Sequence, residues 1–234
     1  MQERAAPPTV LSFETLLVVV GGGTVDHDLL RDLYLAGGRI VAADGGADQV
    51  VAAGLTPEAI IGDFDSLQKP DSWLGRTKLM RIPEQDTTDF EKVLYSTAAP
   101  VTIAMGMTGK RFDHTLAALD AVTRYGRDRT IILVDESDLA MVVAGNFSFE
   151  VEEGARVSVH PLAPIKFRRS YGLKYPLDGI RLAPGERTGT SNTATDGPFR
   201  IEPEPKSRVP WLLILDRKYL FGIAAAASAR AGTA

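Results

Sequence analysis

The feature that most constrains the fold is an alternation of short apolar runs with helical patterns over the first 134 residues. The first run, Leu16 to Val20, is apolar throughout and ends in Gly21-Gly22-Gly23. Such a run is typical of a parallel strand buried on both faces and followed by a tight turn. Further apolar runs lie at residues 39–43, 59–61, 78–82, 101–105 and 130–134, and helical patterns occur between most of them, at 24–37, 47–53, 86–96 and 114–125. This order predicts a mainly parallel sheet flanked by helices.

The pattern changes near Gly145-Asn146. Short alternating segments, punctuated by Gly and Pro, follow at residues 147–151, 156–160, 167–171, 188–192, 199–203 and 211–215. They predict a smaller, antiparallel and sandwich-like β-domain. We therefore expect an α/β domain over residues 1–145, an all-β domain over residues 146–223, and a disordered, Ala-rich tail over residues 224–234.

Composition excludes several classes of protein. The 234-residue chain has no cysteine, which rules out disulfides, cysteine nucleophiles and thiolate zinc sites and fits a cytoplasmic protein. It has no apolar run of about 20 residues, and Met1 to Pro8 lacks the apolar stretch of a signal peptide, so we expect neither a membrane partner nor secretion. Residues 1–145 hold 21 acidic and 13 basic residues, a balance of −8, which argues against nucleic-acid binding and suits a site for divalent cations.

Two carboxylates follow the run at residues 59–61, in the sequence Gly62-Asp63-Phe64-Asp65-Ser66. In an extended chain, residues two apart point to the same side, so Asp63 and Asp65 can share a hard cation such as Mg²⁺. Open α/β sheets bind ligands at the carboxyl ends of their strands. The alternative is a surface turn with two solvated acids, because Asp-x-Asp is a common triplet.

A second acidic motif, Gln85 to Asp89, opens a predicted helix. Asp86 and Asp89 are three residues apart and face each other across one helical turn. Capping explains one such acid, because Asp and Thr are favoured caps and acids suit the first turn of a helix. Capping explains the whole cluster less well, so a functional role stays open beside the structural one.

A segment rich in glycine and positive charge, Gly106 to His114, also follows an apolar run and opens a helix. Its two glycines let the backbone approach a ligand closely, and Lys110 and Arg111 beside a helix N-terminus suit a phosphate. It is not a Walker A loop, and the earlier glycine triplet is not a dinucleotide fingerprint. The structural alternative is a glycine-rich turn capped by Asp113, with His114 as an ordinary hydrogen-bonding residue.

The segment Asp44-Gly45-Gly46-Ala47-Asp48 repeats the order of strand, acid and glycines, then helix. Four strand ends would therefore meet at one edge of the predicted sheet. The carboxylates expected there are Asp44, Asp48, Asp63, Asp65, Asp86, Asp89 and Asp113. With the Lys110-Arg111 pair they describe a metal–polyphosphate site, and no serine elbow is present. Nucleotide-dependent phosphoryl or pyrophosphoryl transfer is the natural interpretation.

The order of these motifs resembles the thiamine pyrophosphokinase (thiamine diphosphokinase) family. The matching segments, from about Val18 to Leu215, are Asp-Gly-Gly-Ala-Asp, Gly-Asp-Phe-Asp-Ser, Gln-Asp-x-Thr-Asp-Phe-x-Lys, Gly-x-x-Gly-x-Arg-Phe-Asp-His and Thr-Ser-Asn. The resemblance implies an ATP-binding α/β domain, a thiamine-binding β-sandwich, and a homodimer with thiamine sites between its subunits. The implied reaction is Mg²⁺-assisted transfer of the β,γ-pyrophosphoryl group of ATP to the hydroxyl of thiamine, which releases AMP.

The resemblance also assigns individual residues. The implied Mg²⁺ and phosphate ligands are Asp63, Asp65 and Asp89, joined directly or through water by Asp44, and Arg111 completes the catalytic set. The implied contacts to ATP and thiamine are Gln85, Thr88, Thr108, Arg111 and Asp113, with Ser191 and Asn192 from the second domain of the partner chain. Some family members stack an aromatic residue on thiamine shortly after the Ser-Asn pair, where this chain has Ala194 and Thr195. Trp211 is a possible substitute, although a core position is its expected role.

Two alternatives remain beside this reading. A pyrophosphokinase for another hydroxymethyl acceptor, such as a pterin, would keep the motifs of the first domain but not the assignment of Ser191 and Asn192. A nucleotide- or thiamine-binding protein without catalysis is the second alternative, which Ala194 favours slightly. The complete set of carboxylates argues against it.

Overall fold

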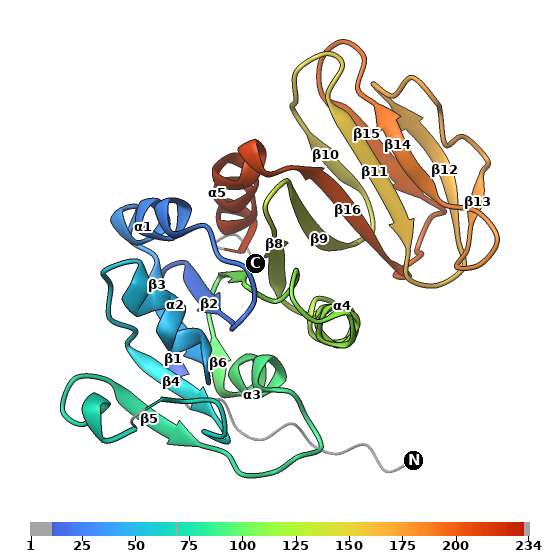
Figure 1. The fold of residues 1–234 in the computed structure, drawn as a ribbon. Coiled ribbons are helices and arrows are strands. Elements are labelled where there is room, and N and C mark those ends of the chain that lie inside the picture. Colours follow the sequence, from blue (N-terminus) through green and yellow to red (C-terminus); the bar gives the residue numbers. More distant parts are fainter. Residues whose placement is uncertain (1–10, 69, 232–234) are drawn as a thin grey trace. The chain divides into compact units, whose positions relative to one another are not determined.

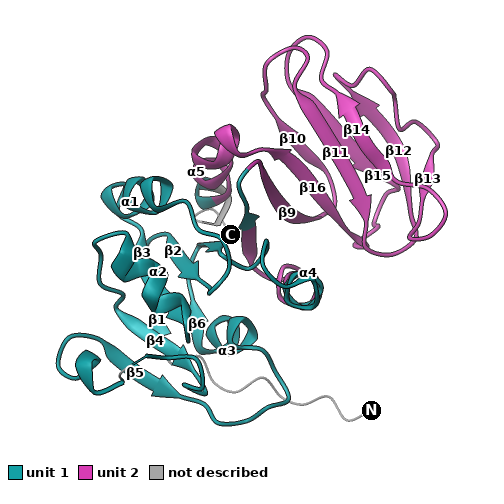
Figure 2. Cartoon of the chain, in the orientation of Figure 1, with its two compact units in different colours: residues 1–121, 133–136, 228–234 teal, residues 122–132, 137–227 magenta. Residues whose placement is uncertain are grey.

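The computed structural model describes residues 11–68 and 70–231. The chain divides into two compact units, which are coloured separately in Figure 2. Unit 1 comprises residues 1–121, 133–136 and 228–234, and unit 2 comprises residues 122–132 and 137–227. Helix α4 (Phe112–Tyr125) and strand β8 (Thr130–Val134) each contribute residues to both units. No helix within the described ranges is long and apolar enough to cross a membrane.

Unit 1 contains a row of parallel strands in the order β7-β2-β3-β4-β5 (Figure 1). Their bounds are β2 (Leu17–Val20), β3 (Arg39–Ala43), β4 (Ala59–Gly62), β5 (Lys78–Arg81) and β7 (Val101–Met105). All four residues of β2 are buried, as a continuous apolar run predicts for a central strand. Strands β1 (Leu11–Ser12) and β6 (Thr97–Ala98) form a separate parallel pair. The prediction of a mainly parallel sheet with helices is confirmed.

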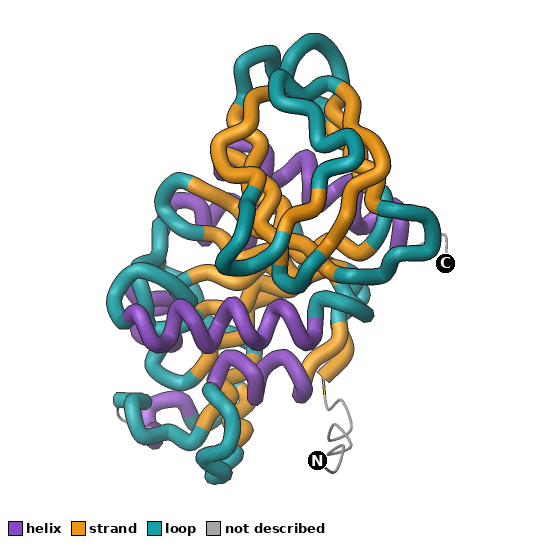
Figure 3. Tube along the Cα trace, turned by 90° about the vertical axis from the view of Figure 1, so that its right-hand side faces the viewer, coloured by secondary structure: helices purple, strands orange, loops and turns teal. Residues whose placement is uncertain are grey.

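Helices alternate with these strands along the chain (Figure 3). They are α1 (His27–Leu35), α2 (Gly46–Ala52), α3 (Asp89–Ser96) and the 3-10 turn η1 (Pro70–Trp73). Helix α2 packs on β2 and β3, and α3 packs on β3 and β4. The sequence pattern placed the start of α3 at Asp86, but the helix begins at Asp89. The Glu84 carboxylate accepts the N–H groups of Asp86 and Thr87, which holds these residues in a loop.

Unit 2 contains two antiparallel arrays of strands. In one array the strands have the order β14-β11-β16-β9. The other array is a separate four-stranded sheet with the order β10-β15-β12-β13. The bounds are β9 (Asp138–Ala144), β10 (Phe147–Phe149), β11 (Arg156–Pro161), β12 (Ile165–Tyr171), β13 (Arg181–Leu182), β14 (Gly189–Thr193), β15 (Phe199–Pro203) and β16 (Pro210–Asp216). The predicted antiparallel sheet late in the chain is confirmed. The sequence pattern did not indicate β9, because it follows β8 after only three residues.

The core of unit 2 is aromatic. Trp211 on β16 is fully buried and makes edge-on contacts with Phe147 and Phe167, at ring-centroid distances of 6.5 and 5.9 Å. These residues come from both strand arrays, so the arrays pack face to face within the unit. The expected core role of Trp211 is confirmed, and a fully buried ring is unable to replace a stacking aromatic at a substrate.

The end of the described chain is helical. Helix α5 (Leu220–Ala231) follows the 3-10 turn η2 (Arg217–Tyr219) and covers most of the segment that we expected to be disordered. Alanine has the highest intrinsic helix propensity, and Leu220, Ile223 and Ala224 are buried. For residues 224–231 the expectation of disorder was therefore wrong, and residues 232–234 lie outside the described part.

Candidate active site

A cavity of about 490 Å³ lies at the carboxyl ends of the parallel strands in unit 1. Its lining comes from the segments that follow β2, β3, β4 and β7, together with the start of α3 and of α4. The polar residues that line it are Asp44, Asp63, Asp65, Ser66, Gln85, Thr87, Thr88, Asp89, Lys92, Thr108, Lys110, Arg111 and His114. Four strand ends that are distant in sequence therefore contribute to one cavity, as expected for a parallel sheet.

Three carboxylates form a group that is able to hold a metal ion. Asp44, Asp63 and Asp65 each offer an oxygen, and these oxygens lie within 4.8 Å of one another. Asp44 is 1% exposed, and its Oδ2 accepts the Ser66 N–H at 2.9 Å. Its Oδ1 is buried and has no hydrogen-bond partner among the described residues. A buried carboxylate oxygen without a partner is costly, and a bound cation would satisfy it.

Burial raises the pKa of Asp44 to about 6, although the Ser66 N–H opposes the shift. The negative charges of Asp89 and Asp65 also contribute to this rise, and the value of about 6 includes their effect. The charged form of Asp44 is therefore disfavoured when no cation is bound beside it. A divalent cation at the group would favour that charged form, because an opposite charge nearby lowers the pKa of a carboxyl.

Asp63 and Asp65 approach each other by a route that the sequence pattern did not predict. Phe64, which separates them, has φ 68°, so the chain makes a left-handed turn there and is not extended. The turn lets Asp63 Oδ1 accept the Asp65 N–H at 3.1 Å. Burial raises the pKa of Asp63, but the hydrogen bonds from Gln85 and from this N–H, with the nearby Lys92 ammonium, outweigh it and lower the pKa overall. Gln85 Nε2 donates to Asp63 Oδ2 at 2.7 Å.

Asp89 is the first residue of α3 and pairs with a buried lysine. Lys92 Nζ lies 3.1 Å from Asp89 Oδ1 and 3.5 Å from Asp63 Oδ2, and the Lys92 side chain is 2% exposed. Burial raises the pKa of Asp89, with Lys92 opposing the shift. Burial lowers the pKa of Lys92, but the two carboxylates outweigh it and raise this pKa overall. Asp89 is not one of the three clustered carboxylates, so its predicted role as a metal ligand stays a prediction.

Lys92 ends the Gln-Asp-x-Thr-Asp-Phe-x-Lys motif, but the sequence analysis assigned it no role. The available signal was its position three residues after Asp89, on the same face of the helix. The same spacing on a helix surface usually indicates an exposed ion pair, and only the structure shows that the lysine is buried between two carboxylates.

Gly62 makes the close approach of Asp44 and Asp89 possible. A Cβ added at Gly62 would lie 2.7 Å from the Asp44 Cβ and 3.0 Å from Asp89 Oδ1. Any side chain at this position would push the two carboxylates apart. The glycine of the Gly-Asp-Phe-Asp-Ser motif is thus explained by packing at the cavity.

The loop before α3 has a structural role that the sequence left open. Thr88 is the N-cap of α3 and forms a capping box with Glu91, so the capping interpretation is confirmed for this residue. Glu84, which the motifs did not include, accepts hydrogen bonds from the Thr87 hydroxyl and from the Tyr95 hydroxyl at 3.0 Å. Burial raises the pKa of Glu84, but its hydrogen bonds outweigh it and lower the pKa overall.

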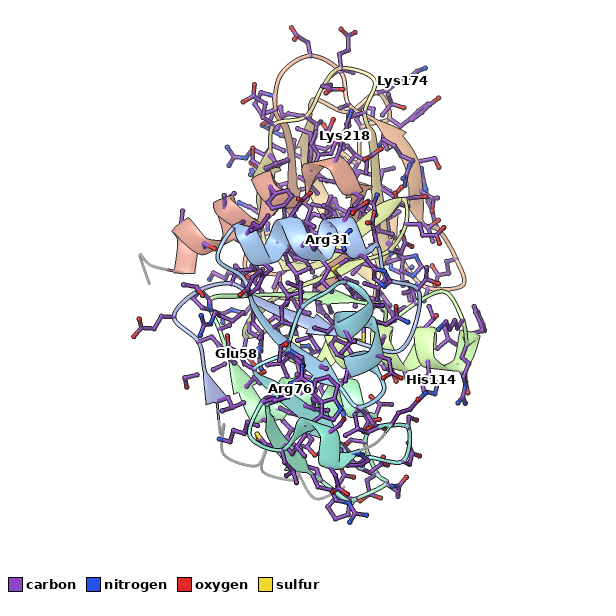
Figure 4. All side chains as sticks on the ribbon, turned by 60° about the vertical axis from the view of Figure 1, so that its left-hand side comes forward. Arg31, Glu58, Arg76, His114, Lys174 and Lys218 are labelled. Atoms are coloured by element: carbon purple, nitrogen blue, oxygen red, sulfur yellow. The ribbon has the colours of Figure 1, made fainter. Side chains whose placement is uncertain are left out.

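The segment Gly106 to His114 contributes cations to the cavity. Lys110 Nζ donates to the Gly22 carbonyl at 3.0 Å, and Arg111 forms an exposed bidentate pair with Asp113. Helix α4 begins at Phe112, so Asp113 lies in its first turn and does not precede it as a cap. His114, labelled in Figure 4, lines the cavity from the same turn. Asp48, Asp86 and Asp113 are not among the lining residues that the structure describes.

The Ser-Asn pair lies in unit 2, on β14. Asn192 is 4% exposed, and its side chain fastens the neighbouring segment. Its Oδ1 accepts the N–H of Tyr175 at 3.0 Å and that of Thr193 at 2.8 Å, and its Nδ2 donates to the Tyr175 carbonyl at 2.7 Å. Ser191 has φ 59° and is exposed. The structure thus gives Asn192 a structural function, and a substrate contact for either residue stays a prediction.

Comparisons with known proteins find relatives of one kind, in sequence and in structure. Residues 32–134 match the model of the thiamin pyrophosphokinase catalytic domain. Thiamin pyrophosphokinase 1 of Caenorhabditis elegans is 28% identical over 173 residues, which cover 66% of this chain and 71% of the relative. Thiamine pyrophosphokinase 1 of Oryza sativa subsp. japonica is 27% identical over 196 residues, covering 69% and 74%.

Two solved structures resemble the chain over most of its length. The thiamin pyrophosphokinase of Geobacillus thermodenitrificans superposes with a TM-score of 0.71 at 25% identity and covers 86% of this chain and 97% of its own. That of Candida albicans gives a TM-score of 0.74 at 17% identity, covering 91% and 94%, and supports the fold alone. The chain is therefore similar to the thiamin pyrophosphokinase family, in its sequence over residues 32–134 and in its fold over most of its length.

Proposed function

We propose that the protein transfers the pyrophosphoryl group of ATP to the hydroxyl of thiamine, giving thiamine diphosphate and AMP. The observation that carries this proposal is the buried Oδ1 of Asp44, which has no partner among the described residues and lies beside Asp63 and Asp65, in a chain that resembles this family. Three converging carboxylates with an unsatisfied buried oxygen suit a reaction that must neutralise polyphosphate charge.

The donor set fits Mg²⁺. All three groups are carboxylates, the hard oxygen ligands that this ion prefers. Asp44, Asp63 and Asp65 would hold the ion, and Asp89 would add a fourth carboxylate at the cation–phosphate site. When bound, Mg²⁺ would withdraw charge from the phosphate oxygens.

The remaining charges would bind the nucleotide. Arg111 and the backbone around Thr108 line the cavity beside the N-terminus of α4, which favours anions. The bidentate bond from Asp113 would hold the Arg111 guanidinium in place for the phosphates. Gln85 and Thr88 would lie near the substrates, since both line the cavity.

The reaction would be an in-line displacement at the β-phosphorus. The hydroxyl oxygen of thiamine forms a bond to this atom, and the bond from the β-phosphorus to the bridging oxygen of AMP breaks. Asp89 would accept the hydroxyl proton and pass it to solvent. Little further covalent help is needed, because such transfers depend mainly on positioning and charge.

The family resemblance extends the proposal beyond unit 1. In a cytoplasmic homodimer, Ser191 and Asn192 of one protomer would contact the pyrimidine of the thiamine bound to its partner. Since the side chain of Asn192 is hydrogen-bonded to the Tyr175 backbone, we assign the direct contact with thiamine to Ser191 and to the backbone segment at Tyr175. The acidic unit 1 would attract the cationic thiazolium ring.

A product assay tests the proposal. The purified protein is incubated with ATP, Mg²⁺ and thiamine, and AMP is separated from ADP. Thiamine-dependent AMP is the expected product, whereas ADP would show ordinary phosphoryl transfer. A parallel reaction with a hydroxymethyl-pterin, alone and in competition with thiamine, identifies the acceptor. Formation of AMP with the pterin but not with thiamine would contradict the proposal.

A further inference from the structure

Lys92 is a buried cation for which the proposed reaction has no direct use. An ammonium is strongly hydrated, so its burial is costly unless carboxylates replace the water. Here two do so, because Nζ lies 3.1 Å from Asp89 Oδ1 and 3.5 Å from Asp63 Oδ2. With 2% of its side chain exposed, Lys92 presents almost no surface to a substrate.

The two carboxylates that Lys92 bridges belong to different parts of the site. Asp63 is one of the three clustered carboxylates, whereas Asp89 is not. Asp63 receives two further donors, Gln85 Nε2 at 2.7 Å and the Asp65 N–H at 3.1 Å. Lys92 is thus the one side chain among the described contacts that links the cation group directly to Asp89.

We propose that Lys92 is a positioning residue, whose ammonium bridges Asp63 and Asp89 so that Asp63 faces the divalent cation and Asp89 faces the acceptor hydroxyl. The inference rests on the proposed function for the role of Asp89. Lys92 acts as an outer partner of a metal ligand, a class of residue that fixes the orientation of the ligand.

A simple charge-balancing role predicts the opposite response of cation binding. If Lys92 only offset the acidic group, its loss would remove a repulsion and divalent cations would bind more tightly. If Lys92 holds Asp63 in place, its loss weakens binding by about tenfold, as for other outer-shell partners. The sign of the change separates the two roles.

The first experiment compares the wild type with Lys92→Met. Free Mn²⁺ is measured by electron paramagnetic resonance without nucleotide, and kcat and KM for thiamine are measured with Mg²⁺ and ATP. We expect Mn²⁺ binding to weaken by about tenfold. We also expect kcat to fall by about 100-fold, more than KM changes, because misplacement acts on the reacting geometry. The matched control is Lys78→Met, because Lys78 is an exposed lysine of unit 1 outside this cavity. It should leave Mn²⁺ binding and kcat unchanged.

The second experiment restores the ammonium chemically. Because the chain has no cysteine, Lys92→Cys carries a single thiol. Aminoethylation in denaturant followed by refolding gives a side chain of nearly the length and charge of lysine. We expect this protein to regain Mn²⁺ affinity and kcat relative to the unmodified variant, with wild type taken through the same procedure as reference. This second experiment still tests the proposal if Lys92→Met does not fold.

Tighter or unchanged Mn²⁺ binding in folded Lys92→Met would overturn the inference, as would aminoethylated protein that folds but stays inactive. The outcome is separate from that of the proposed function. If the wild type forms no thiamine-dependent AMP, the proposed function fails, while the Mn²⁺ titrations still decide whether Lys92 positions Asp63.

Discussion

The acidic cavity of unit 1 and the Ser-Asn segment of unit 2 both carry motifs of the family resemblance, but they use their polar atoms differently. In unit 1, Asp44 Oδ1 is buried without a partner in the described structure, and Asp65 is exposed at the cavity. In unit 2, both side-chain polar atoms of Asn192 are engaged with the backbone of Tyr175, and its oxygen also accepts from Thr193.

Free hydrogen-bonding capacity thus distinguishes a motif that can bind a ligand from one that stabilises the fold. A polar atom with an unused donor or acceptor position can bind a ligand. A polar atom whose hydrogen bonds are all made within the protein stabilises the fold instead. Among the described residues of the cavity, Asp44 Oδ1 is such a position, and its burial makes it costly without a ligand. The Asn192 side chain instead defines the shape of the surface beside Ser191.

The largest expected effect is on Asp65. Asp65→Asn removes one charge from the three-carboxylate group and should lower kcat by about 100-fold or more, because the group would lose cation affinity. Thermal unfolding should stay near that of the wild type, since the side chain is exposed. Asp48→Asn, an exposed acid on α2 outside the cavity, is the matched control. Activity of Asp65→Asn close to that of Asp48→Asn would remove Asp65 from the site.

Gly62→Ala tests whether the approach of Asp44 and Asp89 matters. The added methyl would lie 2.7 Å from the Asp44 Cβ, so the segment that carries Gly62 or the segment that carries Asp44 must move. We expect kcat to fall by about tenfold to 100-fold, because small displacements of reacting groups are costly. Steady-state kinetics with a parallel circular-dichroism melt provide the check. A folded variant with wild-type kcat would show that this spacing is not needed.

Asn192→Ala should act on stability first. It removes three hydrogen bonds and leaves the part-buried N–H and carbonyl of Tyr175 without their side-chain partner, at a cost of about 1–2 kcal/mol. Denaturant unfolding measures the loss. Asn192→Asp keeps the acceptor and loses the donor, so its stability should fall between those of the alanine variant and the wild type. Equal stability of all three proteins would refute the fastening role.

The smallest effect concerns Glu84. Its pKa is lowered in the folded protein, so its charge adds stability above the unfolded pKa of about 4.5, and this contribution is lost as pH falls through the folded pKa. Glu84→Gln should therefore be less stable than the wild type at pH 7, by about 1 kcal/mol. The difference should shrink as the pH falls below about 4.5. A gap of the same size at pH 7 and pH 4 in denaturant titrations would contradict the assignment.

Much of the fold follows from the sequence pattern. Continuous apolar runs such as Leu17–Val20 identify buried parallel strands, because both faces of such strands must be covered. The pattern failed where a local contact or propensity dominated. Glu84 delays the start of α3, and alanine propensity makes α5 a helix where composition suggested disorder.

The site could be predicted as a set of residue types at strand ends, but not as a geometry. The sequence placed Asp63 and Asp65 together for the wrong reason, since Phe64 turns left-handed between them. It did not indicate the burial of Lys92, because burial depends on how α3 packs against the sheet. Nor did it reveal that Asn192 is engaged with Tyr175, a contact across 17 residues.

The most direct test of the central claim is a crystal structure with Mn²⁺ and α,β-methylene-ATP, in which the bond proposed to break cannot be cleaved. Anomalous scattering from Mn²⁺ locates the cation without reference to the protein. We expect a peak within coordination distance of carboxylate oxygens of Asp44, Asp63 and Asp65, with the nucleotide phosphates beside it. A fully occupied nucleotide with its Mn²⁺ peak away from these three residues would contradict it.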